Sequence, residues 1–103
     1  MDAQLKRGLL EACVLSALNR HDSYGYQIIR DLGGCVEISE STLYPILRRL
    51  EAAECLEVYS VEHSGRLRKY YRITAAGRAR LAGYIQDWAE IRTIYQFIIG
   101  GEA

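Results

Sequence analysis

The sequence predicts a mainly α-helical protein with one small β-hairpin, and three observations support this fold class. Residues 39–54 have apolar side chains at helical spacing behind a serine that can cap a helix. Residues 56–73 are rich in β-forming side chains on both sides of a glycine-containing turn. Residues 75–99 carry apolar side chains at alternating steps of three and four residues, which indicates a long helix that packs along one face. A helix followed at once by a charged hairpin is typical of a winged helix-turn-helix unit. Such a unit is expected in residues 1–74, followed by a dimerisation helix in residues 75–103, with one compact domain overall.

The composition is that of a soluble globular domain. Of the 103 residues, half are hydrophobic and a quarter are charged. No apolar run approaches the ~20 residues of a membrane-spanning helix, and the N-terminus lacks a signal-peptide pattern. The cysteines Cys13, Cys35 and Cys55 are more than 19 residues apart and fit neither a zinc motif nor a disulfide framework. The sequence therefore indicates a cytoplasmic protein without a metal site or cofactor. Cys35 and Cys55 are expected to be more exposed than Cys13.

Two helices are expected in the first third of the chain. Residues 4–19 carry apolar side chains around more than one face. This helix is therefore expected to be buried by its own domain and, through Leu9, by a second subunit. Asp22 or Ser23 can cap the second helix, and Gly33-Gly34 is expected to end it with a left-handed residue. Its apolar face is expected to comprise Tyr26, Ile29 and Leu32.

A third helix and a hairpin follow. Ser39 or Ser41 can cap the helix, and Pro45 removes one backbone hydrogen bond early in it. Its core-facing side chains are expected to be Leu43, Ile46, Leu47 and Leu50. The hairpin is expected to have strands in residues 56–61 and 66–73, with its turn at His63-Ser64-Gly65. Thr74 can then cap the last helix, which Gly100-Gly101 is expected to end.

The positive charge of the chain is concentrated in and after the hairpin. The net charge is zero, yet six cations and no acidic residue lie between His63 and Arg80. A run of charges is as often a solvated face as a binding surface. Because the local field at a contact neutralises phosphates, this distribution is still compatible with nucleic-acid binding by a neutral protein.

The polar face of the third helix and the tip of the hairpin are the expected DNA contacts. Hydroxyl groups near a helix N-terminus suit phosphate oxygens, and an arginine further along can reach a guanine edge in the major groove. Cations near the tip of a hairpin can enter the neighbouring minor groove or hold its backbone. The residues assigned to these roles are Ser41, Thr42, Tyr44, Arg48, Arg66, Arg68 and Lys69.

The last helix carries an apolar seam that needs a cover. The seam consists of Leu81, Tyr84, Trp88, Ile91, Tyr95 and Ile98. At 1.5 Å per residue the helix would be roughly 37 Å long. One interpretation is that it folds back over its own core. The favoured one is a two-fold homodimer, in which the seam packs on its copy and on the first helix.

No enzymatic site is expected. The two histidines lie in polar turns, and neither a nucleophile elbow nor a phosphate-cradling loop is present. The alternative function is that of a winged-helix module that binds protein and not DNA. Phosphate contacts would make affinity fall steeply with salt, whereas an apolar protein interface would scarcely respond.

The motifs resemble those of the PadR family of bacterial transcriptional regulators. The matching elements are Tyr24-Gly25-Tyr26, Ser41-Thr42-Leu43-Tyr44-Pro45, Arg49-Leu50-Glu51 and Arg68-Lys69-Tyr70-Tyr71-Arg72-Ile73-Thr74, followed by Gly77. The resemblance covers about residues 5 to 98. It implies a winged-helix homodimer, usually a repressor, that binds double-stranded DNA at a palindromic operator and releases it when a small molecule binds. By this pattern Thr42, Tyr44 and Pro45 belong to the recognition helix, and Gly65, Arg66, Lys69 and Tyr70 belong to the wing.

The single C-terminal helix is similar to that of the small subfamily, whose members often sense planar hydrophobic compounds. This resemblance assigns Trp88, together with Leu15, to a small-molecule effector site. The alternative is that Trp88 only packs the dimer core. Cys55 stands where the family usually has a glycine after the recognition helix. Cys55 is therefore expected either to adopt a left-handed conformation or to change the turn.

Overall fold

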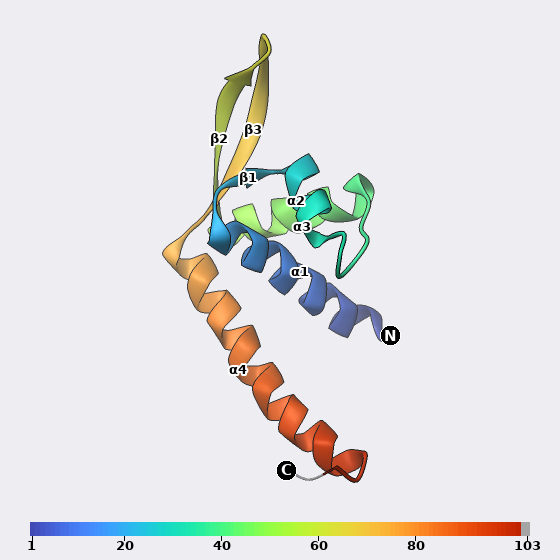
Figure 1. Ribbon diagram of the computed structural model, residues 1–103. Helices are drawn as coiled ribbons and strands as arrows, with labels where there is room; N and C mark the ends of the chain where they lie inside the picture. The colour runs from blue at the N-terminus through green and yellow to red at the C-terminus, as the bar shows by residue number, and fades with distance from the viewer. Residues whose placement is uncertain (102–103) are drawn as a thin grey trace.

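The computed structural model describes residues 1–101, which form four helices and a three-stranded sheet (Figure 1). The predicted mainly α-helical winged helix-turn-helix fold with a long C-terminal helix is confirmed. In chain order the elements are α1 (Ala3–Arg20), β1 (Ser23–Tyr24), α2 (Gly25–Leu32), α3 (Glu40–Ala52), β2 (Leu56–His63), β3 (Arg66–Ile73) and α4 (Ala75–Ile98).

The core lies between α1, α3 and the base of the hairpin. All four side chains predicted to face the core from α3 are buried there, namely Leu43, Ile46, Leu47 and Leu50. Steps of three and four residues place them on one face of the helix. They pack against α1 residues such as Leu15 and Leu18 and against Tyr71 and Ile73 of β3. The opposite face of α3 is thereby left to solvent.

The start of α2 differs from the prediction. Neither Asp22 nor Ser23 caps this helix, because Tyr24 is its N-cap residue and makes no capping hydrogen bond through its side chain. Ser23 instead belongs to β1, which pairs with β3 opposite Tyr71. The carboxylate of Asp22 accepts hydrogen bonds from the Tyr59 hydroxyl at 2.7 Å and from Arg72 Nε at 3.1 Å. Contacts with the hairpin, distant in sequence, therefore outcompete local capping.

The faces and the end of α2 also need correction. Ile28 occupies the fully buried position, whereas Tyr26 is 62% exposed and does not belong to the apolar face. Ile29 and Leu32 are half-buried against the core, as their predicted position requires. The helix does end at Leu32, but Gly33 has φ −61° and is right-handed. The expected left-handed stop is therefore absent here.

The turn after α3 resolves the question raised by Cys55. Glu54 takes the left-handed conformation, with φ 61°. Cys55 itself is buried, so its predicted exposure is wrong, while Cys35 is exposed as expected. The backbone N–H of Cys55 donates to the Leu50 carbonyl at 2.8 Å. Because Glu54 and not Cys55 takes the left-handed conformation, the Cys55 side chain can pack in the core.

The hairpin is longer than predicted and its turn is tighter. His63 pairs with Arg66 at the end of the ladder, so the turn comprises only Ser64 and Gly65. Both residues have positive φ, 52° and 78°, as a type I′ turn requires. The addition of β1 at the other edge of β3 gives the strand order β1-β3-β2, which the sequence did not predict.

Helix α4 extends away from the rest of the molecule. Thr74 caps it by accepting a hydrogen bond from the Gly77 N–H at 3.1 Å, as predicted. Gly100, with φ 79°, follows its end in the expected left-handed conformation. In the described chain only Gly77 and Leu81 of this helix are buried. The interpretation that α4 folds back over its own core is therefore wrong.

This projection makes the molecule elongated. The radius of gyration is 15.6 Å and the extents are 57 × 26 × 22 Å. A compact domain of this length has a radius of gyration of about 13 Å. None of the helices in residues 1–101 is long and apolar enough to cross a membrane.

The first turns of α4 are fixed firmly to the core. Gly77 lies so close to the start of β2 that a Cβ there would be 2.4 Å from the Cys55 carbonyl oxygen. Arg80 Nε lies 3.1 Å from the carboxylate of Glu11, a buried residue of α1. The ring of Tyr84 stacks on Trp88 one turn further along. These contacts set the direction in which the rest of α4 leaves the domain.

Candidate nucleic-acid interface

The predicted contact residues of α3 lie on its solvent side. Ser41, Thr42, Tyr44 and Arg48 are exposed, and Pro45 is half-buried. The Ser39 hydroxyl, at the N-cap, bonds to the hydroxyls of Ser41 at 2.8 Å and Thr42 at 3.3 Å. The predicted capping position at Ser39 is confirmed, although its side chain makes no capping bond to the backbone. A cluster of hydroxyls thus marks the exposed start of the helix.

The predicted wing residues fall into two groups. Gly65, Arg66 and Lys69 are exposed, whereas Arg68 and Tyr70 are half-buried. The Arg68 guanidinium carbon lies 4.0 Å from the centroid of the Tyr24 ring, a cation–π contact. The ring of Tyr70 lies between Tyr24 and Tyr59, with centroids 5.3 Å and 5.7 Å away. Tyr70 therefore helps to join β1 to the hairpin, and Arg68 is held in place by the same aromatic row.

The cations of the hairpin differ in whether they form ion pairs within the chain. Arg72 is 3.1 Å from the Asp22 carboxylate and 3.9 Å from that of Glu57. The hydrogen bond to Asp22 raises the pKa of Tyr59 above its ordinary value. Within residues 1–101, Arg66, Arg68 and Lys69 make no ion pair. The positive charge that is available to a ligand is therefore at the outer half of β3.

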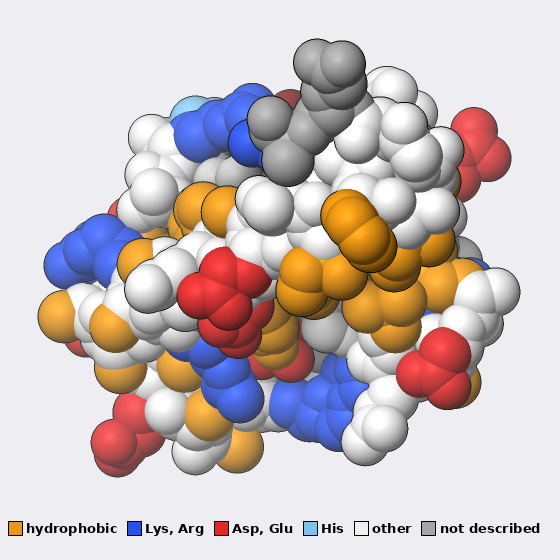
Figure 2. Space-filling model, turned by 90° about the horizontal axis from the view of Figure 1, so that it is seen from below, with side chains coloured by type: hydrophobic (Ala, Val, Ile, Leu, Met, Phe, Trp, Pro, Cys, Tyr) orange, Lys and Arg blue, Asp and Glu red, His pale blue; other side chains and the backbone are white. Residues whose placement is uncertain are grey.

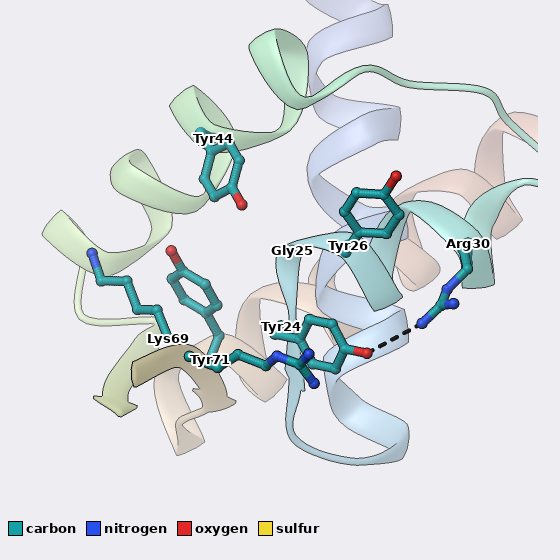
Figure 3. A pocket seen from close by; sticks show the side chains of 8 residues that line it. Tyr24, Gly25, Tyr26, Arg30, Tyr44, Lys69 and Tyr71 are labelled. Carbon is teal, nitrogen blue, oxygen red and sulfur yellow. Dashed lines mark hydrogen bonds between the residues drawn. The ribbon is translucent and has the colours of Figure 1, made fainter. Parts of the chain in front are cut away.

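A cavity joins the recognition-helix surface to the wing. It has a volume of about 440 Å³ and lies between α3, the start of α2 and β3 (Figure 3). Tyr44 enters it from α3, and Arg68 and Lys69 enter it from β3. The other lining residues are Tyr24, Gly25, Tyr26, Arg30 and Tyr71. Sequence reasoning did not assign Tyr24, Tyr26 or Arg30 to a site, although Tyr24-Gly25-Tyr26 was one of the motifs that carried the family resemblance.

Gly25 sets the position of Tyr44. A Cβ at Gly25 would be 2.5 Å from the Tyr44 hydroxyl oxygen, so only glycine lets this ring lie over the start of α2. Figure 3 shows the hydroxyls of Tyr44 and Tyr71 directed toward each other. Burial raises the pKa of Tyr71, and its hydroxyl is protonated at neutral pH as that of an ordinary tyrosine is. The interior wall of the cavity is thus a set of tyrosine hydroxyls.

The predicted dimerisation residues show a gradient of exposure along α4. Leu81 is buried in the core of its own chain, and its part in a dimer contact stays a prediction. Tyr84 and Trp88 are half-buried, as is the predicted dimerisation residue of α1, Leu9. The exposed members of the seam and their exposed fractions are Ile91 52%, Tyr95 54% and Ile98 71%.

The apolar surface of α4 is also wider than the predicted seam. Ile85, Ile94, Phe97 and Ile99 are exposed as well. Seen from below, the molecule presents a group of hydrophobic side chains (Figure 2). Exposed apolar surface of this kind is typical of an interface.

The two residues assigned to an effector site have different surroundings. Leu15 has no exposed surface in this conformation, and its assignment to an effector site stays a prediction. Trp88 is half-buried, with its ring 5.1 Å from that of Tyr84. A shallow cavity of about 340 Å³ lies beside it, lined by Ile85, Trp88, Ala89 and Arg92. An aromatic platform next to a cation is therefore present on α4.

Comparisons with known proteins agree with this arrangement. The model of the PadR-like family of transcriptional regulators matches residues 14–83. A crystal structure of a Streptococcus mutans UA159 protein has 40% sequence identity and a TM-score of 0.82, covering 94% of this chain and 92% of that one. The structure of a PadR-like transcriptional regulator from Bacillus cereus has 32% identity and a TM-score of 0.81, covering 97% of this chain and 100% of that one. The transcriptional regulator Rv3488 of Mycobacterium tuberculosis is 38% identical over 66 residues, which are 64% of this chain and 59% of that protein.

Proposed function

The chain belongs to the PadR-like family of transcriptional regulators, and from this premise we propose that it acts in the cytoplasm as a homodimeric, sequence-specific DNA-binding repressor. The family consists of regulators and not of enzymes. One observation carries the proposal: the exposed face of α3 and the unpaired cations of β3 open onto the same cavity. A single DNA duplex can therefore contact both.

The chemistry of each surface suits a different groove. The hydroxyls of Ser41 and Thr42 and the guanidinium of Arg48 lie on the exposed face of α3, where they can contact phosphates and base edges in a major groove. Arg66 and Lys69 lie on a thin hairpin that can reach the neighbouring minor groove. Base contacts from α3 would supply specificity, and the cations of the wing would supply affinity.

The exposed apolar surface of α4 supports the homodimer. Packing α4 against α4 and α1 of a second copy would cover side chains that the described chain leaves in water. A two-fold dimer presents two copies of α3, and successive major grooves on one side of B-DNA are about 34 Å apart. The operator is accordingly expected to be an inverted repeat.

A planar hydrophobic effector is proposed to bind on Trp88. Such a ligand can shift the dimer only toward the state that it binds better, so it would favour a spacing of the two α3 helices that does not fit the operator. Because Arg92 lines the cavity beside Trp88, a neutral or anionic ring system fits better than a cation.

Naphthalene-2-carboxylate is expected to quench the fluorescence of Trp88, the only tryptophan of the chain. Stacking on the indole would cause the quenching, and Arg92 would attract the carboxylate. Arg92→Gln should weaken this binding and leave binding of neutral naphthalene methanol unchanged. Absence of quenching by both compounds at saturating concentration would remove the effector from the proposal.

The proposed function is tested by selecting binding sites from random duplex DNA. The wild-type protein is expected to enrich an inverted repeat, with affinity that falls steeply with salt. Arg66→Ala plus Lys69→Ala should bind the same repeat more weakly, because the two cations contribute phosphate contacts. The slope of log affinity against log salt should fall by about 4 for the dimer, because each subunit loses two cations, if each cation neutralises one phosphate.

Lys6→Ala plus Arg20→Ala is the matched control for this experiment. It removes two exposed cations of α1 and should change neither the enriched sequence nor the salt slope. Sedimentation should give the same mass for all three proteins. If the wild-type protein enriches no sequence even at low salt, DNA binding is refuted, and a protein partner on the exposed surface becomes the better explanation.

A further inference from the structure

The cavity between α2, α3 and β3 is a concentration of unpaired positive charge. Arg30, Arg68 and Lys69 line it, and none of them makes an ion pair within residues 1–101. Among the described residues no carboxylate lines the cavity either. Three cations around one hollow repel each other, and an anion in the hollow would remove that repulsion.

The side chains from α2 are arranged as hydrogen-bond donors. Arg30 Nη2 donates to the Tyr24 hydroxyl at 3.1 Å and to the Gln27 side-chain oxygen at 2.7 Å, which holds the guanidinium at the rim of the cavity (Figure 3). Its Nε and Nη1 groups make no hydrogen bond within the described residues and can donate to a ligand. The ring of Tyr26 is 62% exposed, with the Arg30 guanidinium 5.8 Å from its centroid. A guanidinium and a hydroxyl therefore stand together at the mouth of the cavity.

The position of the cavity identifies the anion. On B-DNA, one sugar-phosphate backbone separates a major groove from the adjacent minor groove. When α3 lies in the first groove and the hairpin in the second, this backbone must pass between α3 and β3. The cavity opens at that place, since its lining comes from Tyr44 of α3 and from Arg68 and Lys69 of β3.

We propose that this cavity binds one phosphodiester group of each operator half-site, with Tyr26 and Arg30 of α2 as ligands outside the recognition helix and the wing. The inference rests on the proposed DNA-binding function and adds a third element to the interface. Arg68 and Lys69 supply charge from the opposite wall. Because a phosphate contact carries no base information, this site would strengthen binding to all sequences and fix the register of α3 in its groove.

Tyr26→Phe plus Arg30→Gln is expected to weaken binding by about tenfold per half-site, and so by about 100-fold for the dimer, the effect of losing one hydrogen bond to a charged group in each half-site. The salt slope of log affinity should fall by about 2 for the dimer, because one phosphate contact is lost in each half-site. The inverted repeat enriched from random DNA should be unchanged. Both side chains are on the exposed side of α2, so the unfolding transition of the variant should match that of the wild type.

The phosphate itself can be located by ethylation interference. Ethylating one phosphate per half-site, at the boundary between the major groove held by α3 and the minor groove held by the wing, should block the wild-type protein. The same ethylation should affect the Tyr26→Phe, Arg30→Gln variant less, because only Arg68 and Lys69 still face this phosphate. Arg20→Gln, which removes one charge elsewhere, should be blocked as the wild type is.

Gly25→Ala provides a second test. Gly25 does not have a positive φ, so alanine fits its backbone conformation. The new Cβ would displace the Tyr44 hydroxyl, which lies 2.5 Å from its position, and so change the wall of the cavity without adding or removing a charge. Operator affinity should fall while the number of positive charges is unchanged.

Failure of the phosphate site is distinguishable from failure of the proposed function. Enrichment of no DNA sequence by the wild type refutes both. Enrichment of a repeat that the double variant binds with equal affinity and equal salt slope refutes only the phosphate site. A third result would also refute it: inorganic phosphate at constant ionic strength shifts the amide resonances of residues 24–26, while DNA binding does not respond to the double variant. The cavity would then hold a free anion.

Discussion

Ile91→Glu together with Ile98→Glu is expected to convert the protein into a monomer and to weaken binding to its operator by about 10²–10⁴-fold. The two isoleucines are exposed and lie seven residues apart on the same face of α4. In the proposed dimer both would be buried, so the variant would have to bury four carboxylates per dimer or dissociate. Each monomer would then bind a single half-site, without the gain from a second, linked contact. Sedimentation measures the mass, and titration of the selected repeat measures the affinity.

Gln86→Glu plus Thr93→Glu is the matched control for the monomer prediction. It adds the same two charges on the opposite side of α4, where Gln86 and Thr93 are exposed. It should remain dimeric and bind the repeat with nearly the wild-type affinity. If the isoleucine variant also stays dimeric, the seam is not the subunit contact. If it becomes monomeric but keeps full affinity, one half-site is sufficient and the palindrome is unnecessary.

Arg80→Met is expected to lower the free energy of unfolding by about 2–3 kcal/mol. It removes the partner of Glu11, which is only 8% exposed and would be left as an unpaired buried carboxylate. Fully buried pairs lose about 3–5 kcal/mol in this way. The expected loss is smaller because the Arg80 side chain is 42% exposed and water can partly replace it. The contact from Arg80 Nη1 to the Cys55 sulfur, 3.6 Å, is lost as well.

A second substitution should reverse most of this loss. Glu11→Met in the Arg80→Met background removes the stranded carboxylate and replaces it with apolar volume. Urea denaturation of the two single variants and the double variant measures the coupling. Similar losses in Arg80→Met and in the double variant would show that packing of the arginine chain, and not the ion pair, stabilises this junction.

The parts of the fold that could be predicted depend on local spacing. The α3 core residues Leu43 and Leu50 follow from steps of three and four residues, and the cap at Thr74 follows from its own side chain. The cap predicted at Asp22 is absent, because its carboxylate accepts hydrogen bonds from Tyr59 and Arg72, which are far away in the sequence. The sequence around Asp22 favours a helix cap, but the tertiary hydrogen bonds of its carboxylate replace that local interaction. The left-handed residue at Glu54 was missed for the same reason, since burial of Cys55 decides which residue turns.

The candidate site shows a similar division. The exposed face of α3 and the cations of the wing could be assigned from the sequence, because hydroxyls at a helix start and arginines in a hairpin have recognisable chemistry. Arg30 could not, since in the sequence it is one charge at the end of a short helix. It becomes part of the site only when β1 pairs with β3 and brings Tyr24 beside the wing. The burial of Leu81 within its own chain could not be predicted either, because the spacing of apolar residues along a helix does not reveal where the core of one chain ends.

The absence of buried residues beyond Leu81 in the described part of α4 has a consequence for how much active regulator a cell contains. Short isolated helices are marginal in water, so in the proposed homodimer the outer part of α4 would depend on the second subunit for its stability. Folding of this segment and pairing of the chains would then be a single mass-action equilibrium. At chain concentrations below the dimer dissociation constant, the number of paired molecules varies with the square of the number of chains. Halving synthesis would leave about a quarter of the dimers, so the regulator would respond to its own gene dosage more sharply than a monomer would.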